Sequence, residues 1–425
     1  MRSISKNLIL KKISYLMYFL KDARYSFFIT RYLLRGITSG MFSPVKYLYL
    51  NYLGLDKRAI GLIASLSSIT SSCGKVMAGV FPPKRKMFII SLIYGIIAIA
   101  FLFMAISSSI LGSVLSLVII ALLYGLEYVY LNSLMMSSLK PDTFITFYST
   151  VITLWSLASC FATIIAGFMI DAYGFKSILL TVSFVLIILS LVTHYYGFHY
   201  KTYFQSAVSK KGKDRVTFRK RFSIALSYKP YIFYEISTLS RSFAAAMAIP
   251  YVYIFLFEIS NSYRVITMLA SLYPALSLIT TAVQPMVGRL VKKISAFRGL
   301  TLSFIFFSMY YFILSLLNDA FYYLICLFSL CLAILLNNVS IMSFLNELLR
   351  NKEKDIYLGI SGSLSPIPSM VGPIVGGLLI NYLKLRGLFL LSALTCAFSL
   401  IPLNIAKNLC KMEETSVIEQ DSCNG

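Results

Sequence analysis

The chain has 425 residues, of which 58% are hydrophobic and 13% are charged, and its mean hydropathy is +0.79. A soluble domain carries about 25% charged residues to solvate its surface, so this composition excludes an ordinary soluble protein and indicates lipid as a second apolar phase. The net charge of +23 would suggest nucleic-acid binding in a soluble protein, but we expect it to be loop charge and expect no nucleic-acid partner.

The chain begins with a basic segment, residues 1–26. Its short apolar run, 13–20, follows two lysines, and no small-residue cleavage site comes after it. These features favour a cytoplasmic N-terminal segment with an interfacial helix over a signal peptide.

Twelve predominantly apolar stretches follow this segment. A helix needs about 20 apolar residues to cross the hydrocarbon core of a bilayer. The predicted spans are residues 27–52, 59–81, 87–107, 112–138, 144–170, 177–198, 230–257, 264–288, 299–317, 320–347, 356–382 and 386–406. We therefore expect an all-α membrane protein with 12 transmembrane helices.

One polar stretch divides these spans into two sets of six. It is a basic cytoplasmic linker at residues 199–229, whereas the other connections are short. Its position predicts an N-terminal six-helix bundle at 27–198, a C-terminal six-helix bundle at 230–406 and a cytoplasmic tail at 407–425.

Basic residues are distributed unevenly between alternate connections. With both termini inside, the cytoplasmic segments hold 28 Lys and Arg residues and the opposite loops hold 6. Because cytoplasmic loops collect positive charge, we expect a multi-pass protein of the plasma membrane with both termini in the cytoplasm.

The two halves of the sequence are related to each other. Residues 33–66 align without a gap on residues 239–272 with 11 identities in 34 positions, whereas chance would give roughly one in ten. The identities include two arginines (Arg35 with Arg241, and Arg58 with Arg264), a proline and a tyrosine, which hydrophobicity alone does not supply. Gly167–Asp171 is similar to Gly377–Asn381 in the same way. We therefore expect two bundles related by pseudo-twofold symmetry.

The order of these features resembles the major facilitator superfamily of transporters: six spans, a basic cytoplasmic loop, six further spans and a parallel half-repeat. The stretch Gly167-x3-Asp171-x2-Gly174-x-Lys176 resembles the family's loop signature, and Gly372-Pro373-x2-Gly376-Gly377 is similar to its packing motif. The resemblance implies alternating access between two bundles around a central cavity, with Asp171, Gly174 and Lys176 as gating residues.

The loop after the second predicted span departs from the family pattern. It contains Lys84 and Arg85 but lacks the acidic residue that the family has there. Lys84 and Arg85 are therefore candidate gating residues, while import and export both stay open.

Five basic residues remain when the loop charges are set aside, and they lie inside the predicted spans rather than at their first residues: Arg31, Arg35, Lys46, Lys75 and Arg241. Charges at such depth are costly and usually functional, although Arg31 and Lys46 lie near span ends, where a long side chain can reach the membrane surface. Arg35 lies about 13 Å into its helix, and Arg241 is its half-repeat partner at equal depth. We expect Arg35 and Arg241 to bind substrate across the central cavity, with Ser39 on the same stripe as Arg35.

Glu127 is the one acidic residue placed deep within a predicted span. It lies near the level of Arg35, about 16 Å from the cytoplasmic end of its helix. Two interpretations stay open, a structural ion pair with Arg35 and a proton-carrying acid. Asn337 and Asn338, near the half-repeat position of Glu127, either bind substrate or hydrogen-bond neighbouring helices.

Nothing in the sequence indicates an enzyme. The two histidines cluster with no acid or nucleophile, the seven cysteines show no zinc-site spacing, and no nucleotide-binding glycine loop occurs. We expect no metal and no cofactor. The expected partners are a small solute, the lipid bilayer and a coupling proton or counter-substrate, and the expected oligomeric state is a monomer.

The predicted function is secondary transport of a small solute by alternating access. The excess of cations within the spans, with one deep arginine in each half, favours an organic or phosphorylated anion as substrate. This pair also resembles the arrangement in organophosphate antiporters of the superfamily. The alternative is a proton-coupled exporter of drugs or amphiphiles with Glu127 as the proton carrier. A lipid flippase or a non-transporting membrane scaffold is an alternative of another class.

Overall fold

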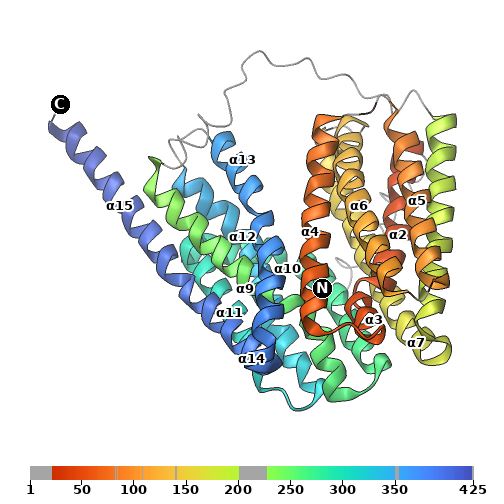
Figure 1. The fold of residues 1–425 in the computed structure, drawn as a ribbon. Helices are drawn as coiled ribbons and strands as arrows, with labels where there is room; N and C mark the ends of the chain where they lie inside the picture. Colours follow the sequence, from red (N-terminus) through yellow and green to blue (C-terminus); the bar gives the residue numbers. More distant parts are fainter. Residues whose placement is uncertain are drawn as a thin grey trace, which may run out of the picture. The chain divides into compact units, whose positions relative to one another are not determined.

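A computed structural model describes residues 22–81, 83, 85–107, 109–138, 141–200, 227–349 and 354–423 (Figure 1). No β-strand occurs within these ranges. The helices are α2 (Ala23–Phe42), α3 (Lys46–Tyr52), α4 (Lys57–Val80), α5 (Lys86–Ile106), α6 (Ile110–Ser138), α7 (Pro141–His199), α9 (Lys229–Ser260), α10 (Tyr263–Ile294), α11 (Ala296–Leu316), the short 3-10 helix η2 (Ala320–Tyr322), α12 (Tyr323–Leu348), α13 (Lys354–Leu364), α14 (Pro366–Phe398) and α15 (Leu400–Cys423). The prediction of an all-α fold is confirmed.

Eight helical segments of the described residues are long and apolar enough to cross a membrane. Two of them, Thr150–His199 and Ile360–Cys410, contain 50 and 51 residues, which is enough for two crossings each. A residue with non-helical backbone interrupts both, Gly174 in α7 and Lys384 in α14. Helices α2 and α10 occupy the two remaining predicted spans, so the helices are consistent with twelve crossings.

The first predicted span is divided rather than continuous. Residues 27–52 form α2 and α3 with a turn between them, where the Val45 amide bonds the Phe42 carbonyl at 3.2 Å. Pro44 lies in this turn, and it has no N–H to continue the helical ladder. Its half-repeat partner Pro250 lies inside the continuous helix α9. The two halves therefore differ in structure at a position where their sequences agree.

Small residues allow α2 to lie directly against α7. A Cβ atom added at Gly40 would overlap the backbone oxygen of Ser159, and one at Gly36 would lie 2.6 Å from that of Trp155. The hydroxyl of Thr163 donates a 2.8 Å hydrogen bond to the Gly40 carbonyl. This close contact fixes the rotation of α2, the helix that carries Arg31 and Arg35.

The second half repeats this packing with the glycines on the opposite helix. A Cβ atom added at Gly372 of α14 would lie 2.7 Å from the Cβ of Ala246, and one at Gly376 would overlap the backbone oxygen of Met247, both on α9. The glycine motif of the eleventh predicted span thus positions α9, which carries Arg241.

The chain forms two compact units. The first contains Met1–Tyr49, Thr70–Lys210 and Tyr263–Leu278, and the second contains Leu50–Ile69, Lys211–Ser262 and Ile279–Gly425. Each unit holds most of one predicted half together with the first part of a helix from the other, α10 in the first unit and α4 in the second. The predicted bundle boundaries, 27–198 and 230–406, stay a prediction.

Candidate functional site

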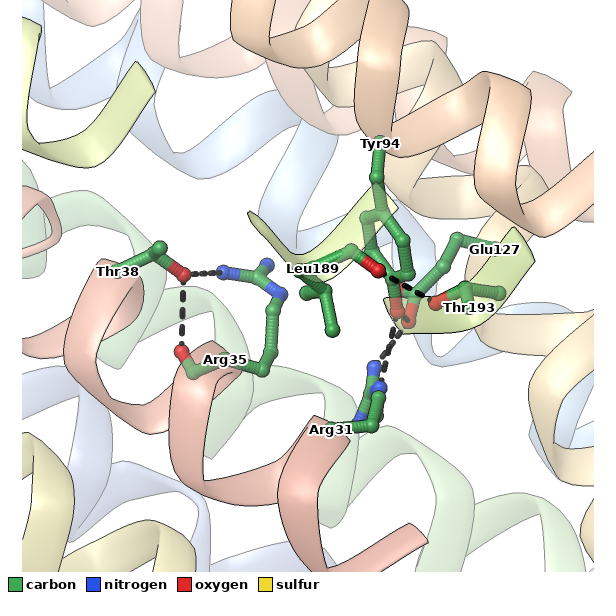
Figure 2. A network of polar contacts seen from close by, with 7 residues as sticks. All are labelled: Arg31, Arg35, Thr38, Tyr94, Glu127, Leu189 and Thr193. Atoms are coloured by element: carbon green, nitrogen blue, oxygen red, sulfur yellow. Dashed lines mark hydrogen bonds and ion pairs between the residues drawn. The ribbon is translucent and has the colours of Figure 1, made fainter. Parts of the chain in front are cut away.

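A buried polar network joins three helices of the first unit (Figure 2). Arg31 of α2 forms an ion pair with Glu127 of α6, and their side chains are only 7% and 5% exposed. The hydroxyl of Tyr94, on α5, accepts a 3.0 Å hydrogen bond from Arg31 Nε and donates a 2.7 Å hydrogen bond to Glu127 Oε1. Each of the three side chains therefore contacts the other two, and the carboxylate is neutralised away from water.

This network gives Glu127 a different partner from the one that the sequence suggested. The guanidinium of Arg35 points away from the carboxylate in Figure 2. It lies 3.9 Å from the ring centroid of Tyr124, and its Nη1 donates to Thr38 Oγ1 at 3.2 Å. Arg31 is 6% exposed, so its side chain does not extend to the protein surface. The ion pair suggested between Glu127 and Arg35 is wrong, because Arg31, one helical turn earlier on the same stripe, contacts the carboxylate.

Arg241 of α9 has aromatic rather than acidic neighbours. Its guanidinium lies 4.8 Å from the ring centroid of Phe307 and 5.6 Å from that of Phe304, both on α11. Its Nη2 donates to Ser242 Oγ at 3.3 Å, whereas its buried Nε has no hydrogen-bond partner. None of the ion pairs formed by the described residues includes Arg241. This guanidinium therefore has capacity to bind an anion.

The other candidate substrate residues differ in exposure. Ser39 is half-buried on α2, one turn after Arg35. On α12 the side-chain oxygen of Asn337 is buried without a hydrogen-bond partner, whereas Asn338 is exposed. A buried side-chain oxygen that no protein group bonds has capacity to bind a ligand, so Asn337 is the stronger candidate of the two asparagines. Arg35 and Ser39 belong to the first unit, and Arg241 and both asparagines belong to the second.

The loop signature connects two helices within the first unit. Asp171 Oδ2 lies 3.2 Å from Nε of Arg264 at the start of α10, and the Arg264 guanidinium lies 4.7 Å from the ring centroid of Phe168. Gly174 takes a φ of 74°, which allows the chain to leave the first helical part of α7. Lys176 follows on the second part and is exposed. Asp171 thus has the kind of breakable ionic contact that a gating residue needs.

The second unit contains the half-repeat counterpart of this contact. Arg58, which aligns with Arg264, faces the side-chain amide of Asn381, which aligns with Asp171. With its amide oriented to match the donors, the Asn381 oxygen accepts from Nε and Nη2 of Arg58. The two halves therefore repeat one contact, with a carboxylate in the first unit and a neutral amide in the second.

The basic loop after α4 contributes less to the described site. Lys84 lies outside the described residues, and Arg85 is an exposed residue immediately before α5. The gating roles of both residues stay predictions.

Tyr94 and Arg264 take part in these contacts although neither is a candidate from the sequence. Tyr94 is one of 30 tyrosines and lies in a uniformly apolar stretch, so its pattern carries no signal. Arg264 counts in the sequence only as loop charge. Its alignment with Arg58 in the half-repeat is the signal that could have identified it.

Buried charges within long apolar helices define a multi-pass membrane protein with a polar interior, as a solute transporter requires. The sequence profile of the Major Facilitator Superfamily matches residues 30–353, which is more than half of the chain. The chain therefore belongs to the Major Facilitator Superfamily of transporters. No curated protein matches the sequence.

Solved structures of transporters share this fold. A bacterial homologue of the human lysosomal transporter Spinster, inward-facing and unoccupied, has a TM-score of 0.67 at 13% identity, and the match covers 94% of this chain and 98% of the homologue. A mutant of the nucleoside transporter NupG gives 0.69 at 13% identity, with coverage of 91% and 99%. A mutant of the peptide transporter POT, in complex with alafosfalin, gives 0.70 at 15% identity, with coverage of 91% and 95%. At these identities the likeness establishes the fold alone.

Proposed function

We propose that this chain is a secondary transporter that moves a small organic or phosphorylated anion by alternating access. The observation that carries the proposal is the environment of Arg241. Its Nε is buried without a hydrogen-bond partner, and its neighbours are the rings of Phe304 and Phe307. Burying a charge without a partner is costly, and a bound anion would remove this cost with charge-assisted hydrogen bonds.

Arg35 supports the same proposal from the first unit. Its guanidinium lies over the ring of Tyr124 and donates a hydrogen bond to Thr38. The carboxylate of Glu127 forms its ion pair with Arg31 instead. Each unit therefore contains an arginine that carries no carboxylate contact among the described residues. A small anion is the ligand class that such arginines recognise best, because the planar fork binds two oxygens at once.

Arg241→Lys is expected to weaken anion binding sharply while the protein stays folded. Lysine keeps the charge but loses the fork, and a charged hydrogen bond contributes about 1.5–3 kcal/mol, so the expected loss of affinity is roughly ten- to a hundredfold. The thermal unfolding temperature of the purified protein is measured at increasing concentrations of inorganic phosphate, citrate or glucose phosphate, and its shift reports binding of the anion. Glucose and neutral drugs are screened in parallel at matched ionic strength.

Arg298→Lys is the matched control for this experiment, because Arg298 is exposed at the start of α11, the helix that carries both phenylalanines. It is expected to bind the anions as the parent does. Equal anion-induced shifts in the parent and in Arg241→Lys would refute the anion site.

The alternative of a proton-coupled drug exporter depends on Glu127 as the proton carrier. Glu127 already has Arg31 and the Tyr94 hydroxyl as partners, so these contacts favour a structural ion pair over a proton-exchanging acid.

The asymmetry of loop charge supports a plasma-membrane location with both termini in the cytoplasm. The linker lysines at 210, 211 and 213, outside the described residues, would then lie inside, and Lys57 outside. We expect an impermeant maleimide to label Lys57→Cys on intact cells, but to label Lys210→Cys only after permeabilisation. Both variants are made without the native cysteines. Labelling at position 210 in intact cells would contradict this orientation.

A further inference from the structure

Lys75 is a charged residue inside a predicted span that the proposed anion site does not use. It lies on α4 and is exposed, and its ammonium lies 5.3 Å from the ring centroid of Tyr128 on α6. None of the ion pairs within the described part of the chain includes it. A charge inside a span is costly where it faces lipid, so the direction of Lys75 around its helix decides what it can do.

The exposed apolar residues in the second half of α4 lie on the other side of the helix from Lys75. At 100° per residue they form a stripe about 100° wide that consists of Cys73, Val76, Met77 and Val80. Lys75 lies about 150° from the middle of this stripe, on the side of two half-buried serines, Ser71 and Ser72. An exposed apolar stripe is the surface that faces lipid, so Lys75 faces away from lipid and toward water.

Glycines bring α4 directly against α6 beside Lys75. A Cβ atom added at Gly74 would overlap the backbone oxygen of Leu122, and one added at Gly125 would overlap that of Ser71. Lys75 follows Gly74 directly along α4, and Tyr128 lies three residues after Gly125 on α6. The contact between the two helix backbones therefore holds the lysine beside the tyrosine ring.

A second cation lies on the same face of α6. Tyr124 precedes Tyr128 by one helical turn, and its ring centroid lies 3.9 Å from the guanidinium of Arg35. Residues four apart share a helix face, and these two positions lie about 6 Å apart along the axis. Arg35 from α2 and Lys75 from α4 therefore approach one face of α6 at neighbouring levels, and all four residues belong to the first unit.

The charges around this face leave it positive. Glu127, on the same helix, forms its ion pair with Arg31. Neither Arg35 nor Lys75 takes part in an ion pair of the described residues. The tyrosine rings attract both cations but do not neutralise them. Two positive charges about one helical turn apart, some 6 Å, are therefore available to a ligand.

We propose that Arg35 and Lys75 form a two-cation site for an organic anion with two acidic groups, such as a dicarboxylate. One acidic group binds the Arg35 guanidinium, whose planar fork holds two oxygens, and the other binds the Lys75 ammonium as a point charge. The distance between the two acidic groups then sets the specificity of the site. The inference rests on the proposed function and narrows its substrate class to anions with two acidic groups.

Binding of dicarboxylates to the purified full-length protein in lipid nanodiscs tests this proposal. The probes are malonate, succinate, glutarate and adipate, with butyrate as the singly charged reference at matched ionic strength. The thermal unfolding temperature is measured at increasing concentrations of each probe, and its shift reports binding. In the parent we expect the dicarboxylate of best length to bind roughly tenfold more tightly than butyrate, as for one added charged hydrogen bond.

Lys75→Met is expected to lose this preference and to bind every dicarboxylate as weakly as butyrate, because methionine keeps a straight side chain without the charge. Lys75→Arg restores the charge and is expected to keep the preference. Lys293→Met, at an exposed lysine of α10, is the matched control and is expected to behave as the parent. A preference for dicarboxylates that survives in Lys75→Met, or a parent that binds none of them better than butyrate, would overturn the proposal.

The direction of Lys75 is tested without any anion, in a background that lacks the other native cysteines. Lys75→Cys is expected to react quickly with a water-soluble thiosulfonate, because the reactive thiolate forms in contact with water. Native Cys73 alone, on the apolar stripe of the same helix, is expected to react much more slowly. A reaction at position 75 that is no faster than the reaction at Cys73 would also overturn the proposal.

The two proposals fail in different ways. A parent that binds phosphate through Arg241 but shows no preference for dicarboxylates has no two-cation site, while the proposed function stands. A parent that binds no anion at all contradicts both proposals.

Discussion

Glu127→Gln is expected to lower the free energy of unfolding by about 3–5 kcal/mol. Glutamine preserves the shape of the side chain and an acceptor for Tyr94, but it leaves the Arg31 guanidinium buried without a counter-ion. Thermal and denaturant unfolding of the purified protein in lipid measures the loss. A large effect here would show that the pair holds α2, α5 and α6 together.

The double variant Arg31→Met with Glu127→Leu is expected to recover most of that stability. Removing both charges replaces a buried ion pair by apolar contacts, which is often close to neutral. If the double variant is as unstable as Glu127→Gln alone, the network contributes through shape or hydrogen bonding to Tyr94 rather than through charge pairing.

Glu258→Gln provides the matched control. Glu258 forms a 2.5 Å ion pair with Lys57, but these side chains are 47% and 32% exposed. Solvent screens such a pair, so the expected cost is about 0–1 kcal/mol. Equal losses for Glu127→Gln and Glu258→Gln would contradict the role given to burial.

Gly174→Ala is expected to lower the free energy of unfolding by about 1–3 kcal/mol. Gly174 combines a φ of 74° with a ψ of 179°, a backbone region that is almost exclusive to glycine. No atom lies within 4 Å of a Cβ at this position, so the loss would come from backbone strain and not from a clash.

Lys384→Gly is expected to have the opposite effect. Lys384 lies at the equivalent break in α14 with a φ of 56° and a ψ of 177°, so a lysine occupies the same glycine-type conformation. Relief of this backbone strain outweighs the extra conformational freedom of glycine in the unfolded chain. We therefore expect the free energy of unfolding to rise by about 1 kcal/mol.

Gly288→Ala tests whether these two effects come from the backbone conformation. Gly288 lies inside α10 without a positive φ, and a methyl group added there would meet open space. Alanine is a better helix former than glycine, so we expect the free energy of unfolding to rise by up to about 1 kcal/mol. A loss at position 288 as large as that at position 174 would contradict the strain argument.

The broad fold could be predicted from sequence because membrane crossing imposes a simple length rule. Apolar stretches of about 20 residues identify spans, and the half-repeat relates them. The break at Pro44 was not predicted, because the same residue at position 250 is accommodated within a continuous helix. Proline alone does not decide between a break and a tolerated kink, since neighbouring packing also contributes.

The site could be predicted only in part. The depth of a residue in a span does not specify where its side chain points around the helix, or which residue of a neighbouring helix it contacts. The sequence places Glu127 at the level of Arg35, yet the partner in contact is Arg31, with Tyr94 completing the network.

The Arg31–Glu127 pair also bears on how the protein enters the membrane during its synthesis. Helix α2 contains 20 residues, but among the described helices it is not one of the eight segments apolar enough to cross on their own. Its counter-ion, Glu127, is translated almost a hundred residues later than Arg31. Until then the nascent α2 would expose an unpaired guanidinium to lipid, which is unfavourable. Stable insertion of α2 is therefore a cooperative step that is completed only when α5 and α6 have been made.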